Sequence, residues 1–460
     1  NIQMEDNSTT PMEMRLSETP GMPSPELELS YSTAIPMNGS TFSEQQEVRI
    51  GLNVPADSFV DLKRAYLKYK LNNTGAGAAF LDPVIGGVSV IQNWRVVSGT
   101  GALLEEVINY NAFYALMNSY KNKDVVSSVH NIMEGASKNP AVGLKTNANN
   151  TNAEMGGCTS ITNAQSKVIT HRPASAFFNA DRYLPLGFTQ GLTYVSLTLA
   201  QNSTAFIISN ENEANASSYT ISEVELHLPI LRPGPEFAAM FRSAMSSGIP
   251  IQIHSVGVQN TQQAIPSGAT GEQTLTFSTR KRSVKSLVNV LRPSANITSD
   301  ERNSVSGFVN ADTTEYNYSV GGQRIPAQRI KCQAGINGID MGELLANTQL
   351  ALGHYSSDLR GICSIHTTNT MVNGGNEEYL NDSEHDGKCG KAVFALDLES
   401  YNAAFSGMNL AGNGLPLIWH AQVGGTEGAQ ANGSLQCDLF VVHDIVFLLD
   451  GVTGVLSANS

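Results

Sequence analysis

Apolar and polar residues alternate over short stretches along most of the chain, a pattern that predicts β-strands. The clearest stretch is residues 219–230, where Val224, Leu226 and Leu228 are separated by charged or polar residues. Glycine-containing turns bound another strand at residues 88–97. The remaining predicted strands are residues 47–54, 61–71, 166–170, 193–199, 205–209, 249–258, 273–278, 286–291, 315–320, 392–398, 416–423 and 436–449.

Three segments have a helical pattern instead. Residues 236–248 place apolar side chains at helical spacing and end at a glycine, so they predict an amphipathic helix. Residues 342–352 form a second predicted helix, with Asp340 as its cap and Gly353 at its end. A third helix is predicted at residues 103–118, after a glycine-rich turn.

The helix at residues 236–248 follows the breaker Pro233-Gly234-Pro235 near the middle of the chain, with β-rich halves of about 200 residues on either side. Long spacings between strands favour jelly rolls over small barrels. The predicted fold is therefore all-β, two consecutive jelly-roll β-sandwiches with a few short helices. Because the halves share no evident residue identity, the duplication is one of architecture. The predicted division is an arm at 1–27, a first roll at 28–232, a connecting helix at 233–248 and a second roll at 249–460.

Residues 1–27 lack a sustained period and are rich in proline, glutamate, serine and methionine. Such a segment cannot bury a core, so we expect a flexible arm that becomes ordered on a partner. The first residue is Asn1 rather than methionine, so we expect an upstream piece that either lies outside the sequence or was removed by proteolysis. Intact-mass measurement of the purified protein tests this expectation.

Charged residues make up only 15% of the chain, below the ~25% typical of soluble domains, and the formal net charge is -13. Low charge is expected of a protein whose sides are buried against neighbours. The acidic balance argues against nucleic-acid binding, which needs clustered Lys and Arg. No window approaches ~18 consecutive apolar residues, and no secretory signal is visible.

The cysteines are odd in number and far apart, without a CxxC pair, so we expect reduced thiols in a cytosol-like compartment. They are Cys158, Cys332, Cys363, Cys389 and Cys437.

Enzyme motifs are missing from the sequence: it contains no G-x-S-x-G, H-E-x-x-H or G-x-x-x-x-G-K-[ST] stretch. Carboxylates are adjacent in several places, but adjacency does not aim two side chains at one bond, so solvated loops are expected. Such pairs include Glu105-Glu106, Glu377-Glu378 and Asp300-Glu301. We therefore predict no catalytic residue, no cofactor-binding residue and no cofactor.

The richest polar cluster is residues 381–389, which hold Asp382, Glu384, His385 and Asp386. A divalent-metal loop is one interpretation, but the spacing lacks the alternation and the distal glutamate of a calcium loop. An exposed loop is the favoured alternative. His420 and His443 lie in apolar strands, where a lone histidine is more often a hydrogen-bonded residue than a metal ligand. We predict no metal site.

One basic run stands out at Arg280, Lys281, Arg282 and Lys285. It fits contact with an anionic surface such as packaged nucleic acid or lipid headgroups. The favoured alternative is a charged strand edge that blocks unwanted strand pairing. A weaker basic group comprises Arg324, Arg329 and Lys331.

An ordered set of segments resembles the double jelly-roll major capsid proteins of virophages and polinton-like viruses. Residues 80–117 resemble that family's strand, Ser-Gly-rich turn, acidic "LE" and "NYN" helix. Residues 219–248 resemble the closing strand of its first roll and the helix between rolls. The other matching segments are 178–199, 274–292, 318–326, 406–409 and Asp450-Gly451, and the set covers most of residues 40–455.

The resemblance implies a structural protein, the major capsid subunit of a tailless icosahedral DNA virus, which forms pseudo-hexagonal homotrimers that tile the shell. It implies partners: further copies of the chain, a penton protein, minor or cement proteins and an internal membrane in some lineages. Direct genome contact is not expected of so acidic a chain. The expected location is the virion capsid, assembled in host cytoplasm or nucleus.

A different class remains open, a glycan-binding (lectin-like) or carbohydrate-active β-sandwich protein, since jelly rolls also serve lectins and cupins. Sugar stacking usually needs exposed aromatic residues. The two tryptophans, Trp94 and Trp419, both lie in apolar strand-like runs, where burial is expected. The nine histidines are scattered, which argues against cupin-type metal chemistry.

Overall fold

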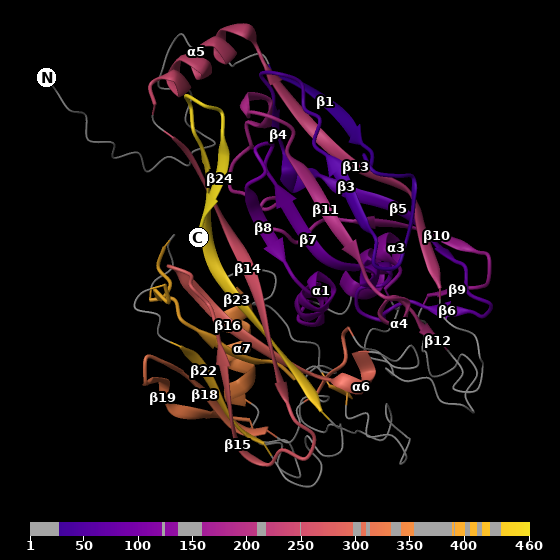
Figure 1. Ribbon diagram of the computed structural model, residues 1–460, viewed down its shortest axis with the longest axis vertical. Coiled ribbons are helices and arrows are strands. Elements are labelled where there is room, and N and C mark those ends of the chain that lie inside the picture. The colour runs from indigo at the N-terminus through magenta and orange to yellow at the C-terminus, as the bar shows by residue number, and fades with distance from the viewer. Residues whose placement is uncertain are drawn as a thin grey trace, which may run out of the picture.

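The computed structural model describes residues 27–121, 125–136, 159–208, 218–248, 250–297, 305–309, 313–332, 342–353, 389–390, 392–400, 405–411, 416–423 and 434–460. Two β-sandwiches lie side by side, the earlier one drawn from indigo to magenta and the later one from pinkish red through orange to yellow (Figure 1). We call them the first roll and the second roll. Among the described strands, none is shared between the sheets of the two rolls.

The first roll has two main sheets that face each other. One has the order β1-β13-β5-β10, with β2 and β4 also pairing with β13, and the other has the order β3-β11-β7-β8. Its strands are β1 (Leu27–Ala34), β2 (Thr41–Ser43), β3 (Glu47–Gly51), β4 (Phe59–Val60), β5 (Tyr66–Asn73), β6 (Ala79–Phe80), β7 (Ile91–Val97), β8 (Leu103–Val107), β9 (Ser160–Ile161), β10 (Ser166–His171), β11 (Tyr194–Leu199), β12 (Ile207–Ile208) and β13 (Tyr219–Pro233).

The second roll repeats this arrangement, with one sheet in the order β14-β23-β16-β21 and the other in the order β15-β22-β18-β19. Its strands are β14 (Ile251–Ile265), β15 (Gly271–Phe277), β16 (Val284–Pro293), β17 (Phe308–Val309), β18 (Thr313–Val320), β19 (Gln323–Lys331), β20 (Cys389–Gly390), β21 (Phe394–Asp397), β22 (Leu417–Val423), β23 (Leu435–Leu449) and β24 (Leu456–Asn459).

The main strands of both rolls follow one topology. Numbered along the chain within each roll, the eight strands form sheets of order 1-8-3-6 and 2-7-4-5. This is the jelly-roll order, in which two Greek keys place the first and last strands side by side. The predicted fold, all-β with two consecutive jelly rolls, is confirmed.

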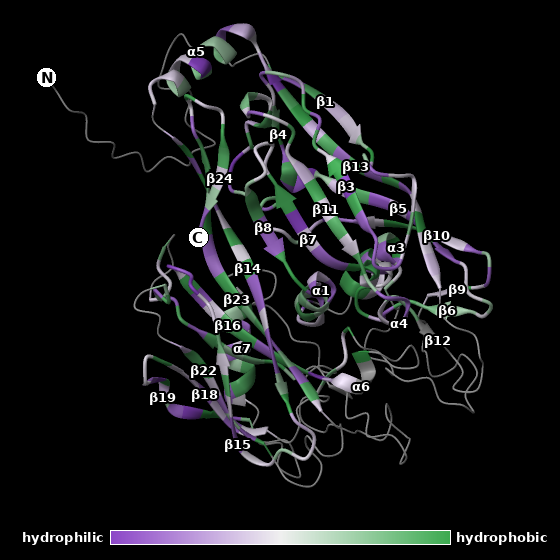
Figure 2. Ribbon diagram, in the orientation of Figure 1, coloured by the Kyte–Doolittle hydropathy of each residue, from purple (hydrophilic) through white to green (hydrophobic). Residues whose placement is uncertain are grey.

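Alternation along each strand builds the two cores. In β5, Leu67, Tyr69 and Leu71 are buried, whereas Lys68 and Lys70 lie on the outer face beside glutamates of β13. Figure 2 shows this alternation as changing colour along the strands of the first roll. Trp94 and Trp419 are fully buried, as predicted.

Helices are short and lie between strands. They are η2 (Leu62–Arg64), η3 (Gly87–Val90), α1 (Tyr110–Ser119), η4 (Val126–His130), α3 (Asn131–Glu134), η5 (Leu186–Phe188), α4 (Asn202–Ala205), α5 (Pro235–Ser246), α6 (Ser294–Ile297) and α7 (Gly342–Gly353). The helices predicted at 236–248 and 342–352 are confirmed as α5 and α7. α1 and α7 each follow the fifth strand of their roll. None of the described helices is long and apolar enough to cross a membrane.

The third helix prediction, residues 103–118, is wrong in its first half. Leu-Leu-Glu-Glu-Val has a high helix propensity, yet it forms β8 and pairs with β7. The chain turns into α1 only after Asn109, which adopts a left-handed conformation with φ of 51°. The strand predicted at 88–97 begins later than expected, because residues 87–90 form η3. Similarly, the strand predicted at 205–209 is reduced to β12, after the short α4.

Candidate functional site: the junction between the rolls

A buried ion pair lies where the two rolls meet. Asp438 of β23 accepts hydrogen bonds on Oδ2 from Arg292 of β16, at 2.8 Å from Nε and 2.7 Å from Nη2. Both side chains are almost completely buried. Arg292 has a fork geometry that suits a carboxylate, and a charge removed from water requires such a partner.

Amide groups complete the coordination of this carboxylate. Asp438 Oδ1 accepts hydrogen bonds from Asn109 at 3.1 Å, Gln262 at 2.8 Å and Gln436 at 3.1 Å. Asn109 belongs to the first roll, whereas the other groups belong to the second. The left-handed turn that ends β8 thus delivers an amide across the boundary between the rolls.

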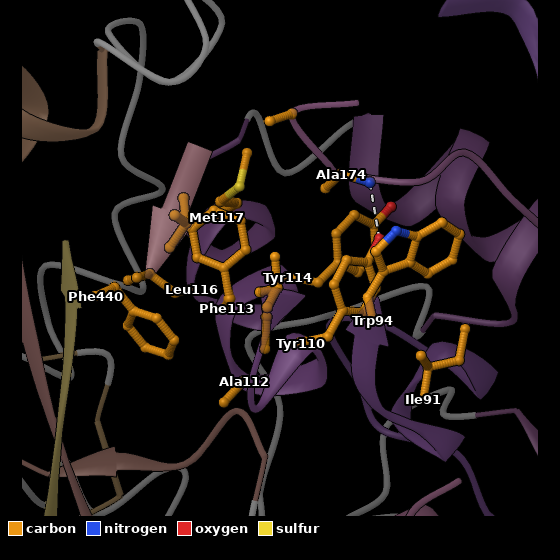
Figure 3. Close-up of a cluster of buried hydrophobic side chains, with 14 of the residues drawn as sticks. Ile91, Trp94, Tyr110, Ala112, Phe113, Tyr114, Leu116, Met117, Ala174 and Phe440 are labelled. Atoms are coloured by element: carbon orange, nitrogen blue, oxygen red, sulfur yellow. Dashed lines mark hydrogen bonds between the residues drawn. The ribbon is translucent and has the colours of Figure 1, made fainter. Parts of the chain in front are cut away.

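Aromatic contacts also join the two rolls, at separate points along β23. Phe113 of α1 meets Phe440 of β23 with ring centroids 5.6 Å apart, and Figure 3 shows the two side chains facing each other. Phe177 meets Phe447 of β23 edge-on, at 5.3 Å. All four side chains are buried. Such pairs add to the free energy gained by burying their area, so the junction is packed like a core.

The loop that carries Phe177 is held by Glu105. This buried carboxylate accepts hydrogen bonds from the Ser175 hydroxyl at 2.5 Å and from the backbone N–H groups of Ala176 at 2.6 Å and Phe177 at 3.0 Å. Burial raises the pKa of Glu105, and these hydrogen bonds act in the opposite direction. The Ala176 carbonyl in turn accepts a hydrogen bond from Ser255 of β14, at 2.7 Å.

Glu106, the neighbour of Glu105, points to the other face of β8 and pairs with Arg95 at 2.5 Å. The two adjacent carboxylates therefore do not converge on one bond. Glu105 is buried, however, so the expectation of a solvated loop is wrong for this residue. The pairs Asp300-Glu301 and Glu377-Glu378 lie outside the described residues.

The connecting helix α5 is fixed to both rolls. Phe241 packs against Phe59 of β4 at a centroid distance of 5.0 Å and against Phe188 at 4.7 Å. On its other side, the turn after β23 approaches so closely that a Cβ on Gly451 would lie 2.1 Å from the Met245 carbonyl oxygen. The junction is therefore continuous from α5, drawn at the upper end in Figure 1, to α1.

The basic run does not form one surface. Lys285 is buried and pairs with Glu399 at 2.9 Å and Asp444 at 3.6 Å, and Lys281 bonds Ser460 at 2.7 Å. Only Arg280 and Arg282 are exposed. The interpretation as a strand edge is wrong, because β16 lies between β23 and β21.

The weaker basic group does lie on an edge. Arg324, Arg329 and Lys331 belong to β19, the last strand of its sheet, which was not among the predicted strands. Arg329 pairs with Glu315 at 2.7 Å and Glu272 at 2.5 Å. Charges on an exposed edge strand discourage pairing with another chain.

His420 and His443 are hydrogen-bonded strand residues. His420 contacts the Ser319 hydroxyl at 2.9 Å, and His443 Nδ1 lies 3.0 Å from the Asp444 carbonyl. Burial, together with the charge of Lys281, lowers the pKa of His443 to about 3. Among the residues the structure describes, no group of three or more His, Cys, Asp and Glu could hold a metal ion. Residues 381–388 lie outside them.

The first roll also contains a buried polar cluster that was not predicted from the sequence. The Glu134 carboxylate contacts Nδ1 of His171 at 2.8 Å and Nδ1 of His130 at 2.7 Å. The Tyr114 hydroxyl donates a hydrogen bond to the same carboxylate at 2.7 Å. Burial alone would raise the pKa of Glu134, but the hydrogen bonds from the two histidines lower it to about 2. The spacing of His130 and Glu134, four apart, was the available signal; His171 is distant in sequence. The Tyr110 hydroxyl joins the cluster to the Ala174 N–H (Figure 3).

One edge strand has an exposed apolar row. Leu27, Leu29 and Tyr31 point to the same side of β1 and are 58%, 47% and 74% exposed. Among the described strands, β1 pairs with β13 and with no other strand. An unpaired edge with apolar side chains is a surface suited to association.

Solved structures of viral capsid proteins are similar to this chain over nearly its whole length, whereas no family model and no curated protein matches the sequence. PBCV-1 VP54, fitted into a reconstruction of the virophage Sputnik, aligns with a TM-score of 0.58 at 11% identity, over 96% of this chain and 99% of that chain. The Faustovirus major capsid protein aligns with a TM-score of 0.56 at 8% identity, over 95% of this chain and 92% of that chain. A chain of the cryo-EM structure of the Sputnik virophage aligns with a TM-score of 0.54 at 12% identity, over 100% of this chain and 94% of that chain. At this level of identity the likeness is one of fold, and the chain has the double jelly-roll fold of these viral capsid proteins.

Proposed function

We propose that the chain is the major capsid subunit of a tailless icosahedral DNA virus and that its function is assembly. The observation that carries the proposal is the repeated topology, two jelly rolls of one strand order fixed side by side in one chain. Three such chains around a threefold axis place six similar lobes around it, and a pseudo-hexagonal unit of this kind can tile a shell. The capsid proteins of the same fold support the proposal.

The packed junction supports a rigid capsomer. Asp438, Arg292 and Asn109 join the rolls through buried hydrogen bonds, so the two lobes keep one relative orientation. A fixed orientation is what a sixfold outline needs, because neighbouring subunits must meet the same surfaces each time.

The proposed partners are copies of the chain, first in a homotrimer and then in neighbouring capsomers. The exposed row of Leu27, Leu29 and Tyr31 on β1 supports such association. A penton protein, minor or cement proteins and an internal membrane complete the proposed set. Direct genome contact is not proposed, because the chain is acidic and only Arg280 and Arg282 of the basic run are exposed.

The proposal keeps the division into an arm at 1–27, rolls at 28–232 and 249–460, and a connecting helix at 233–248. It is supported by the end of β13 at Pro233 and the start of β14 at Ile251, with α5 between them. The proposed location is the virion capsid, assembled in host cytoplasm or nucleus. Free buried thiols at Cys332 and Cys437 fit folding in a reducing compartment.

We do not favour the carbohydrate-binding alternative. Trp94 and Trp419 are fully buried and cannot stack on a sugar. Nor do Glu105 and Glu106 form a pair flanking one bond, as glycoside hydrolysis requires.

Electron microscopy of the purified chain under assembly-promoting conditions tests the proposal. Hexagonal particles that associate into curved sheets or closed shells are expected. Specific binding on a glycan array by a chain that never assembles would overturn the capsid function and favour the carbohydrate-binding alternative.

A further inference from the structure

Two neighbouring hollows lie beside β4 and α1 of the first roll, and one of them is also lined by Ile251 and Ile253 of β14. One, of about 700 Å³, is lined by Phe59 of β4, Phe241 of α5 and Tyr183, among others. The other, of about 630 Å³, is lined by α1 and α3 and by Phe178. Lys63 lines both, so they meet at that side chain.

The charges around the hollows are mainly positive, although the whole chain is acidic. Five cations line them: Lys63, Arg64, Lys121, Arg172 and Arg182. Of the three lining carboxylates, Asp61 and Glu134 are buried, which leaves Asp181 as the exposed one. Lys63, Arg172 and Arg182 have no ion-pair partner among the described residues. The hollows therefore favour an occupant that is both anionic and apolar.

The start of the described chain lies close to the first hollow. Leu29 of β1 is in register with Leu231 of β13, and Leu231 is in register with Phe59 of β4. Directly opposed residues point to the same face of a sheet, so the three side chains share one face. Two strand spacings, about 10 Å, separate Leu29 from Phe59. The first residues of β1 therefore lie on the same face of the sheet as Phe59, within reach of the hollow.

Residues 1–26 precede Leu27 and have the complementary composition. They carry five carboxylates and a single cation, Arg15, together with four methionines, Ile2 and Leu16. Methionine adapts well to irregular apolar surfaces. A chain of this length reaches far beyond the distance required, at about 3.3 Å per extended residue.

We propose that residues 1–26 dock in the two hollows of their own chain, with their carboxylates facing Lys63, Arg172 and Arg182. Docking within one chain is favoured because the covalent link at Leu27 gives the arm a high effective concentration beside its site. The inference is independent of the capsid function, since it concerns the isolated chain.

Limited proteolysis of the full chain tests the proposal, because Arg15 is the sole trypsin site within residues 1–26. Cleavage is followed by mass spectrometry as the loss of residues 1–15. The double variant Lys63→Glu/Arg182→Glu replaces two exposed cations of the hollows. We expect its cleavage rate at Arg15 to rise at least about tenfold over that of the unmodified chain, a change equivalent to 1.4 kcal/mol.

Arg280→Glu is the matched control, an exposed arginine of the second roll without a partner among the described residues. It should leave the rate at Arg15 unchanged, and thermal denaturation checks that all variants fold. Equal rates in the unmodified chain and the double variant would overturn the proposal. Protection that increases with chain concentration would place the arm on a second copy and would also overturn it.

Discussion

At the residue scale, neighbours in sequence have opposite environments. Glu105 is buried and holds a loop of the junction, whereas Glu106 is on the surface beside Arg95. The sequence alone showed two adjacent carboxylates and could not show which one the sheet would bury. The partners of Glu105, residues 175–177, are distant in sequence and meet it only in the folded chain.

Glu105→Gln is expected to destabilise the protein by about 1–3 kcal/mol, because an amide replaces one acceptor oxygen with a donor facing backbone N–H groups. Glu106→Gln removes only a surface ion pair and should change stability by at most about 1 kcal/mol. Urea denaturation of both variants checks this. Equal effects of the two substitutions would contradict the assigned role of Glu105.

His443 predicts a pH dependence of stability. Its pKa falls from the ordinary 6.5 to about 3 in the folded protein, so the unfolded chain binds more protons between these values. Stability from this residue is therefore complete above about pH 6.5 and is lost as the pH falls towards 3, with a slope of at most about 1.4 kcal/mol per pH unit. The free energy of unfolding, measured by denaturation at several pH values, should depend more steeply on pH in the unmodified chain than in His443→Gln over this window. Identical slopes would contradict the buried neutral imidazole.

At the element scale, most strands and two of the three helices could be predicted from apolar periodicity. The predictions failed where the place of a segment in a sheet, rather than its local sequence pattern, decides its structure. β8 was predicted as a helix because its local propensity is helical, and pairing with β7 overrides that propensity. β19 was not predicted as a strand, because its Gln, Arg and Lys residues leave no alternating apolar face, as suits an edge strand.

Gly451 tests how tightly α5 is fixed. Gly451→Ala would place a Cβ against the backbone of Met245, so the helix or the turn must shift, and we expect a loss of about 1–3 kcal/mol. Gly342→Ala, at the start of α7, has open space around its Cβ and should be neutral or slightly stabilising. Thermal denaturation distinguishes the two. A neutral Gly451→Ala variant would show that α5 is not held by this contact.

At the scale of the whole molecule, the two rolls act as one body. The sequence indicated two similar halves, but Asn109, Arg292 and Asp438 carry no motif, and their meeting depends on the fold of both halves. Long-range packing of this kind is invisible to periodicity.

Asp438→Asn would remove the carboxylate charge that pairs with Arg292 in the buried junction, which should cost about 3–5 kcal/mol. Because Asn109 also loses its charged acceptor, we expect calorimetry to resolve separate unfolding of the two rolls. Glu223→Gln, which removes an exposed pair with Lys70, is the control and should leave one transition. A single unchanged transition in Asp438→Asn would contradict the importance of this junction.

Assembly into trimers is tested first by the native mass of the purified chain, measured by light scattering, with negative-stain images of the same fractions. A homotrimeric capsomer predicts a species of about 147 kDa, three times the chain mass of 49.1 kDa, with hexagonal outlines. A stable monomer of 49.1 kDa that never assembles would contradict it.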